Sequence, residues 1–173
     1  MILRRDCKGL TLIELVIALG LLASILALGY ALYFFATSSF NRGETQSRVQ
    51  FDLRMASAFI TKEVRNATSL ALIPTPTAFV NNNNMNYIFV RDGRIIHRLN
   101  GVETAKTDAI IPEPLIFRLH QLTDADNIVR NVLEFTLTGR LAAQQHSIST
   151  EVFLNNLHGL SIQDNHAIRY AKP

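Results

Sequence analysis

Apolar residues dominate one long stretch near the start of the chain. The 22 residues from Leu15 to Ala36 contain no charged side chain. A helix of that length spans roughly 33 Å, enough to cross the hydrocarbon core of a membrane. Arg4, Arg5 and Lys8 lie just before the run, and basic residues hold that end of a spanning helix in the cytoplasm. The pattern predicts one membrane span, with the rest of the chain on the far side.

A second helical pattern covers residues 44–68. Asn41-Arg42-Gly43 predicts a break or bend before it, because Asn and Gly end helices readily. Apolar residues then recur at i, i+4, i+7 and i+8 and predict one face packed against a sheet. The residues of this face are Phe51, Met55, Ala58 and Phe59, extended by Leu53, Ala56, Ile60, Val64 and Ala67. Pro74 and Pro76 close the helical region and begin a linker.

The clearest sign of β-structure is a hairpin. The segments Asn86–Arg91 and Arg94–Leu99 flank Asp92-Gly93, which is typical of a type I′ turn. Pairing Arg91 with Arg94 gives one face that is apolar with a histidine. The other face carries three arginines beside Tyr87 and Phe89, and we interpret it as a solvated surface. The alternative is a basic, aromatic grip for DNA or another anionic surface.

Three later segments alternate between apolar and polar residues. They are 115–121, 129–138 and 147–154, and this alternation is typical of an antiparallel sheet with one wet face. The residues predicted to point inward are Leu115, Phe117, Leu119, Leu133, Phe135, Leu137, Ile148, Val152 and Leu154. Residues 139–145 are predicted to connect the last two strands. Residues after Gly159 are expected to add a short edge strand, and residues 167–173 to form a loose tail.

Glu14 does not fit a plain membrane anchor. It lies inside the apolar block, where an unpaired charge is costly. The surrounding segment, Lys8-Gly9-Leu10-Thr11-Leu12-Ile13-Glu14-Leu15-Val16, resembles the processing motif of type IV pilins and type II secretion pseudopilins. The resemblance implies that a prepilin peptidase cuts after Gly9, that the new first residue Leu10 is N-methylated, and that Glu14 serves assembly. The family usually has Phe where this chain has Leu10.

The spacing around Glu14 has a physical interpretation. Cleavage creates a positive amine at Leu10, and a neighbouring subunit displaced along a helical bundle could bring its amine to this carboxylate. The pair would neutralise both charges and set the axial register. The alternative is a carboxylate that snorkels to the membrane surface and binds nothing specific.

The resemblance also implies an organisation for the whole chain. The expected parts are a leader (1–9), a transmembrane and assembly helix (10–36), its amphipathic continuation (37–70) and an antiparallel β-rich head (71–173). The fold class is α+β. Implied partners are other pilins, the prepilin peptidase and an inner-membrane assembly platform, and the membrane before assembly. The N-terminus would be cytoplasmic and the head extracytoplasmic, later in a filament at the cell surface or in the periplasm.

Weaker similarities occur beyond the processing motif. The segments 53–56, 62–67 and 149–156 resemble the corresponding segments of minor pilins and J-type pseudopilins. The expected function is therefore that of a minor pilin or pseudopilin that joins or initiates a filament. The alternatives are a filament-tip module that binds DNA, surfaces or exported substrate, and a membrane-anchored enzyme, for which no site supports the assignment.

Charge and cysteine content narrow the function further. The net charge is +3, but the leader contributes two of these charges, so a nucleic-acid footprint in the mature chain is unsupported. The single cysteine, Cys7, lies in the leader.

Ala27-Leu28-Gly29 could imitate a signal-peptide cleavage site, but the apolar run is too long and Glu14 interrupts it.

No catalytic residue, cofactor or metal site is expected from the sequence. The five histidines are scattered, and no HExxH, phosphate-binding loop or nucleophile elbow occurs. Asp124-Ala125-Asp126-Asn127 offers oxygen atoms to Ca²⁺, but a calcium loop needs more ligands. We interpret this segment as a tight turn between strands.

Overall fold

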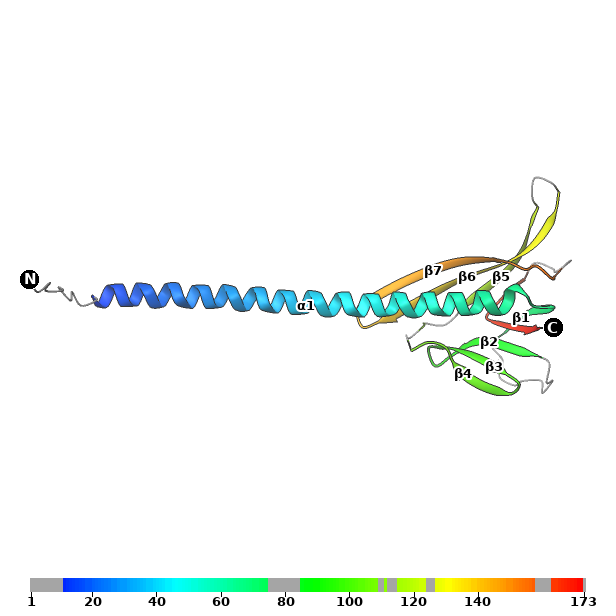
Figure 1. Ribbon diagram of the computed structural model, residues 1–173, viewed down its shortest axis with the longest axis horizontal. Helices are drawn as coiled ribbons and strands as arrows, with labels where there is room; N and C mark the ends of the chain where they lie inside the picture. The colour runs from blue at the N-terminus through cyan, green and yellow to red at the C-terminus, as the bar shows by residue number, and fades with distance from the viewer. Residues whose placement is uncertain are drawn as a thin grey trace, which may run out of the picture. The chain divides into compact units, whose positions relative to one another are not determined.

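The computed structural model describes residues 11–74, 85–108, 111, 115–123, 127–157 and 163–172. It has an α+β fold, as predicted (Figure 1). Its elements are α1 (Leu12–Arg65), β1 (Ser69–Ile73), β2 (Asn86–Arg91), β3 (Arg94–Leu99), β4 (Val102–Ala105), β5 (Ile116–Thr123), β6 (Val129–Leu141), β7 (Gln144–Phe153), β8 (Gln163–Asn165) and β9 (Ala167–Ala171). The chain divides into two compact units, Met1–Gly43 and Glu44–Pro173, which are considered separately.

Helix α1 runs without interruption for 54 residues. The predicted break at Asn41-Arg42-Gly43 is therefore wrong. A glycine inside a helix costs only about 1 kcal/mol relative to alanine. Ending the helix there would instead leave backbone N–H and C=O groups without partners on both sides. The helix ends at Arg65, earlier than the residue 68 that the pattern predicted.

The buried face of α1 in the second unit matches the prediction only in part. Leu53, Ala56, Ile60 and Val64 are buried as predicted, but other residues of the predicted face are not. Phe51 and Met55 are 62% and 55% exposed, and Ala58 is also exposed. The residues that face the interior are Val49, Leu53, Ala56, Ser57, Ile60 and Val64. At 100° per residue this set lies opposite Phe51, Met55 and Ala58. The sequence places apolar residues on both sides of the helix, so periodicity alone did not identify the side that meets the sheets.

The first sheet has the strand order β1-β9-β2-β3-β4, and all its pairs are antiparallel. The predicted hairpin is confirmed in its register, with Arg91 opposite Arg94 and Val90 opposite Ile95. Asp92 and Gly93 have φ values of 52° and 69°. Positive φ at both central residues is what a type I′ turn requires.

Strand β9 corrects the prediction of a loose C-terminal tail. It lies in the middle of the first sheet, between β1 and β2, and Ile168 and Tyr170 are completely buried. Its five residues are too few for a convincing alternation in the sequence. The strand forms because β1 and β2, both distant in the chain, offer hydrogen-bonding partners on its two sides. Strands β1 and β4 were not predicted either.

The second sheet has the order β7-β6-β5-β8. Its inward-facing residues are as predicted, although Ile148 is only partly buried. The connection predicted over 139–145 is wrong, because β6 continues to Leu141, β7 begins at Gln144, and the turn is only Ala142 and Ala143. Gly139 marks a close approach to the helix instead. A Cβ atom there would lie 3.1 Å from side-chain atoms of both Val49 and Leu53.

The two sheets flank the last part of α1 in the second unit (Figure 1). Ser57 on the helix is 2.8 Å from Thr150 on β7 through their hydroxyl oxygens. On the other side, the rings of Phe59 and His97 of β3 meet with centroids 5.0 Å apart. One apolar core includes residues of α1 and of both sheets.

A smaller apolar cluster forms on the opposite face of the first sheet. It consists of Tyr87, Phe89 and Ala167, with Ile73, Met85 and Ile96 packed against it. Tyr87 and Phe89 are 3% and 0% exposed. The interpretation of this hairpin face as solvated is therefore wrong for its aromatic residues, because the first sheet is covered on both faces here.

Candidate functional site at the start of the apolar helix

The N-terminus of α1 is capped by the side chains of two residues that are three positions apart, Thr11 and Glu14. The Thr11 backbone N–H and hydroxyl both donate to Glu14 Oε2 at 2.9 Å. In return, the Glu14 backbone N–H donates to Thr11 Oγ1 at 3.3 Å. This reciprocal arrangement is a capping box, which satisfies backbone N–H groups that the first helical turn leaves without partners. Sequence reasoning missed Thr11, although the Thr-x-x-Glu spacing before an apolar run is its known signal.

The capping box fixes the position of the Glu14 carboxylate. Glu14 is the acidic residue of the first turn, where the positive end of the helix dipole favours a negative charge. Its side chain is exposed, so a cation from another chain can reach it. The role of Glu14 in assembly remains a prediction.

Hydroxyl groups along the apolar part of α1 bond to the backbone of the helix itself. Ser24 donates to the Gly20 carbonyl at 2.9 Å, Thr37 to Tyr33 at 2.9 Å and Ser38 to Phe35 at 3.0 Å. A polar group without a partner in hydrocarbon is costly, and these bonds remove that cost for the three side chains. They leave the helix compatible with an apolar environment.

The large apolar side chains of this part of the helix are exposed. Leu21 and Phe35, for example, are 61% and 69% exposed. The most apolar stretch of this helix is not buried within the protein. By length and composition the helix can cross a membrane. A contiguous apolar surface of this extent requires a cover from outside the chain, either lipid or other protein.

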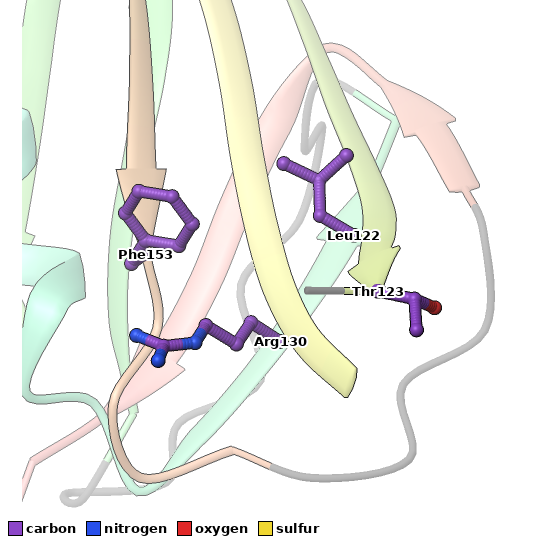
Figure 2. Close-up of a pocket in the computed structure, with 4 residues that line it drawn as sticks. All are labelled: Leu122, Thr123, Arg130 and Phe153. Atoms are coloured by element: carbon purple, nitrogen blue, oxygen red, sulfur yellow. The ribbon is translucent and has the colours of Figure 1, made fainter. Parts of the chain in front are cut away.

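The second unit offers a different surface feature at one end of its four-stranded sheet. Leu122, Thr123, Arg130 and Phe153 line a cavity of about 300 Å³. Figure 2 shows the Arg130 side chain extending from β6 toward the end of β7, near the Phe153 ring. One cation and one hydroxyl among apolar groups offer no acid–base pair and no nucleophile with a base.

The basic hairpin face does not form the proposed grip for nucleic acid. Arg91 and Arg98 each contact a carboxylate oxygen of Glu103, at 2.8 and 3.2 Å. The Arg91 guanidinium also lies 4.8 Å from the centre of the Phe89 ring. Because Tyr87 and Phe89 are buried, their rings cannot stack on bases.

The remaining candidate residues that the structure describes do not gather into a metal site. Among the described residues, no three His, Cys, Asp or Glu side chains lie where they could hold a metal ion. Asp124 and Asp126, on which the calcium interpretation rested, lie outside the described residues. So do Gly9, Leu10 and Cys7, and the cleavage and methylation sites stay predictions.

A comparison with known protein families matched the start of the chain. Residues 4–30 match the family described as the prokaryotic N-terminal methylation motif. No curated protein and no solved structure matches the chain. The matched residues include the capping box and the first part of the exposed apolar helix. This chain therefore carries, at residues 4–30, the N-terminal methylation motif that is the signature of type IV pilins and pseudopilins.

Proposed function

We propose that this protein is a minor pilin or pseudopilin subunit that joins or initiates a type IV pilus-like or type II secretion filament. The observation that carries the proposal is the methylation motif at 4–30, joined directly to a helix whose large apolar side chains are exposed. The role is structural, not enzymatic.

The proposed sequence of events begins in the membrane. A prepilin peptidase cuts after Gly9 and Leu10 is N-methylated, while the N-terminus faces the cytoplasm and the head lies outside. The apolar helix then leaves the lipid and enters a bundle of other pilin helices. Lipid chains and apolar side chains are similar solvents, so packing and polar contacts drive this association.

Glu14 supplies the specific polar contact in this proposal. The capping box holds its carboxylate at the start of the helix before any partner arrives. Among the described residues, the hydrogen bonds to this carboxylate come from Thr11 and go to Oε2. The incoming amine of a neighbouring subunit would pair with this carboxylate. The ion pair is favourable because it neutralises two charges in an apolar bundle, and it occurs only at one axial register.

The test replaces Glu14 by Ala in cells that carry the partner pilins. The chain should still be cut, so that mass spectrometry finds Leu10 as the first residue, and it should still fractionate with membranes. Cross-links to other pilins and filament number should fall strongly. Glu44→Gln is the matched control, because Glu44 is exposed on the same helix beyond the apolar run. It should leave all three measurements unchanged.

Two outcomes would contradict different parts of the proposal. Mature protein that begins at Met1 would exclude processing, and Gly9→Val provides the reference for uncut precursor. Unchanged cross-links in Glu14→Ala would show that the carboxylate sets no register, and the assembly mechanism would have to be abandoned for this protein.

A further inference from the structure

A polar cluster in the second unit joins the end of α1 to the first sheet. The Tyr170 hydroxyl of β9 donates to Glu63 Oε2 on α1 at 2.6 Å, and His97 Nε2 of β3 lies 2.9 Å from the same hydroxyl oxygen. Lys172 Nζ lies 2.8 Å from Glu63 Oε2. Tyr170 is completely buried and His97 is 6% exposed. We call these four residues the Glu63 cluster.

The charges around this cluster come from several elements. Glu63 provides the carboxylate, and its Oε2 lies 4.0 Å from His97 Nε2. Lys172, which follows β9, and Lys106, which follows β4, provide two ammonium groups that act on His97. Lys106 Nζ also lies 5.1 Å from the centre of the Phe59 ring, which itself packs against His97. Positive charge therefore exceeds negative charge around His97 even when the ring is neutral.

The direction of the hydrogen bonds places a proton on one nitrogen of His97. Tyr170 has one proton and donates it to Glu63, so its oxygen accepts a hydrogen bond from the imidazole. Nε2 of His97 therefore carries a proton, in the neutral ring as well as in the charged one. A second proton on the ring adds a charge to a buried site that already has two ammonium groups. Protonation of Glu63 would remove the only charge that compensates them among the described residues of the cluster.

The pKa values agree with this geometry. Burial lowers the pKa of His97, and the positive charges of Lys106 and Lys172 lower it further. The negative charge of Glu63 raises this pKa but does not outweigh them. Burial raises the pKa of Glu63, but hydrogen bonds from Lys172 and Tyr170 outweigh it and leave the pKa below its ordinary value. Burial and the bond to Glu63 raise the pKa of Tyr170.

We propose that the Glu63 cluster is an acid-sensitive lock that fastens the C-terminal strand β9 to the end of helix α1. Strand β9 is inserted between β1 and β2, and its Tyr170 side chain donates to the Glu63 carboxylate of the helix. Opening the cluster would remove the side-chain bonds between this strand and the helix, so the backbone pairs of β9 would open more often, although Ile168 and Tyr170 still pack in the core that includes α1. The inference is independent of the proposed assembly function, because it concerns the second unit alone.

The sign of the pH dependence follows from linkage. A histidine whose pKa is lowered by folding contributes stability that is complete above its unfolded value of 6.5 and is lost as the pH falls through its folded value. Glu63 has a pKa of 4.5 in the unfolded chain and a lower one in the folded protein. It therefore adds a second loss of stability as the pH falls below 4.5. Tyr170 acts at the alkaline end of the pH range. Its pKa is 10.0 in the unfolded chain and higher in the folded protein, so stability is lost as the pH rises above 10.0. The lock is therefore closed between these limits and opens first through His97.

Hydrogen–deuterium exchange of the full-length protein in detergent micelles tests the lock. Exchange is followed by mass spectrometry at pH 7.5 and 5.5, after correction for intrinsic rates. Peptides from β9 and from the last turns of α1 should lose protection several-fold at pH 5.5, while a β6 peptide should not. In His97→Gln the pH dependence should disappear, because the amide can still donate to Tyr170 but does not titrate.

Two further variants distinguish opening of the Glu63 cluster from an effect of low pH on the whole protein. His146→Gln, on β7 of the other sheet, should keep the wild-type pH dependence. Tyr170→Phe retains the ring but removes the hydroxyl, so β9 should exchange at pH 7.5 about as fast as wild-type β9 does at pH 5.5. The proposal is overturned if wild-type β9 is equally protected at both pH values, or if its loss at pH 5.5 persists in His97→Gln. It is equally overturned if Tyr170→Phe leaves β9 protected.

Discussion

Helix α1 behaves differently in the two units of the chain. Before Gly43 its large apolar side chains are exposed, and Leu21 is 61% accessible. After Glu44 the same helix buries apolar residues completely, and Leu53 is 0% accessible. Polar side chains differ in the same way. Ser24 bonds to a carbonyl of its own helix, whereas Ser57 bonds to Thr150 on a strand of the second sheet.

The difference shows that one secondary structure can meet two environments. In the first unit the helix satisfies its polar groups locally and leaves its apolar surface to be covered by lipid or other chains. In the second unit the protein supplies that cover itself, through two sheets. The first unit should therefore tolerate changes that the second does not, and matched substitutions in the two units measure this contrast.

Shortening a leucine should give the largest contrast. Leu53→Ala removes a fully buried side chain from the core of the second unit, and we expect a loss of about 2–5 kcal/mol in its free energy of unfolding. Leu21→Ala removes an exposed side chain of the same kind and should leave that free energy unchanged. Urea unfolding of the full-length protein in detergent, followed through the near-ultraviolet signal of its tyrosines, measures both. Equal losses in the two variants would contradict the division of the helix into an uncovered and a covered part.

Adding a methyl group should have a smaller effect. Gly139→Ala places a Cβ atom 3.1 Å from side-chain atoms of Val49 and Leu53, in a packed core. We expect a loss of about 1–3 kcal/mol, because both neighbours are buried and have little room to shift. The control is Gly20→Ala, where nothing lies within 4 Å and alanine is the better helix former. The same unfolding experiment applies, and a stability equal to wild type in Gly139→Ala would show that the helix is not held close to β6.

The sequence predicted local features of the fold well. The β2–β3 hairpin has its predicted register because its turn and its alternation lie within fourteen neighbouring residues. The inward residues of β5 and β6 were also predicted, since alternation reports which face is apolar. Features that depend on distant partners were missed. Strand β9 exists because β1 and β2 lie on either side of it, and the exposure of Phe51 and Met55 depends on where the two sheets meet α1.

The candidate site divides in the same way. The methylation motif and Glu14 could be found from a short stretch of sequence, and the match at 4–30 confirms the motif. The capping role of Thr11 was within reach of the same stretch. The Glu63 cluster was not, because Tyr170 and His97 are separated by 73 residues and Tyr170 and Glu63 by 107. No local pattern indicates that Tyr170, His97 and Lys172 will gather around the carboxylate of Glu63.

The smallest effect is expected from the ion pairs of the first sheet. Glu103→Gln removes the charge that contacts Arg91 at 2.8 Å and Arg98 at 3.2 Å. Such pairs near the surface are screened by water, so the loss should be below about 1 kcal/mol, and it should shrink further in 1 M salt. Glu151→Gln, an exposed carboxylate on β7, is the control and should match wild type. Urea unfolding at low and at high salt separates the part of this loss that comes from the charges, which salt screens, from the part that salt does not change. A loss near that of Leu53→Ala, unchanged by salt, would mean that the first sheet depends on its charges and not on the core that it shares with α1.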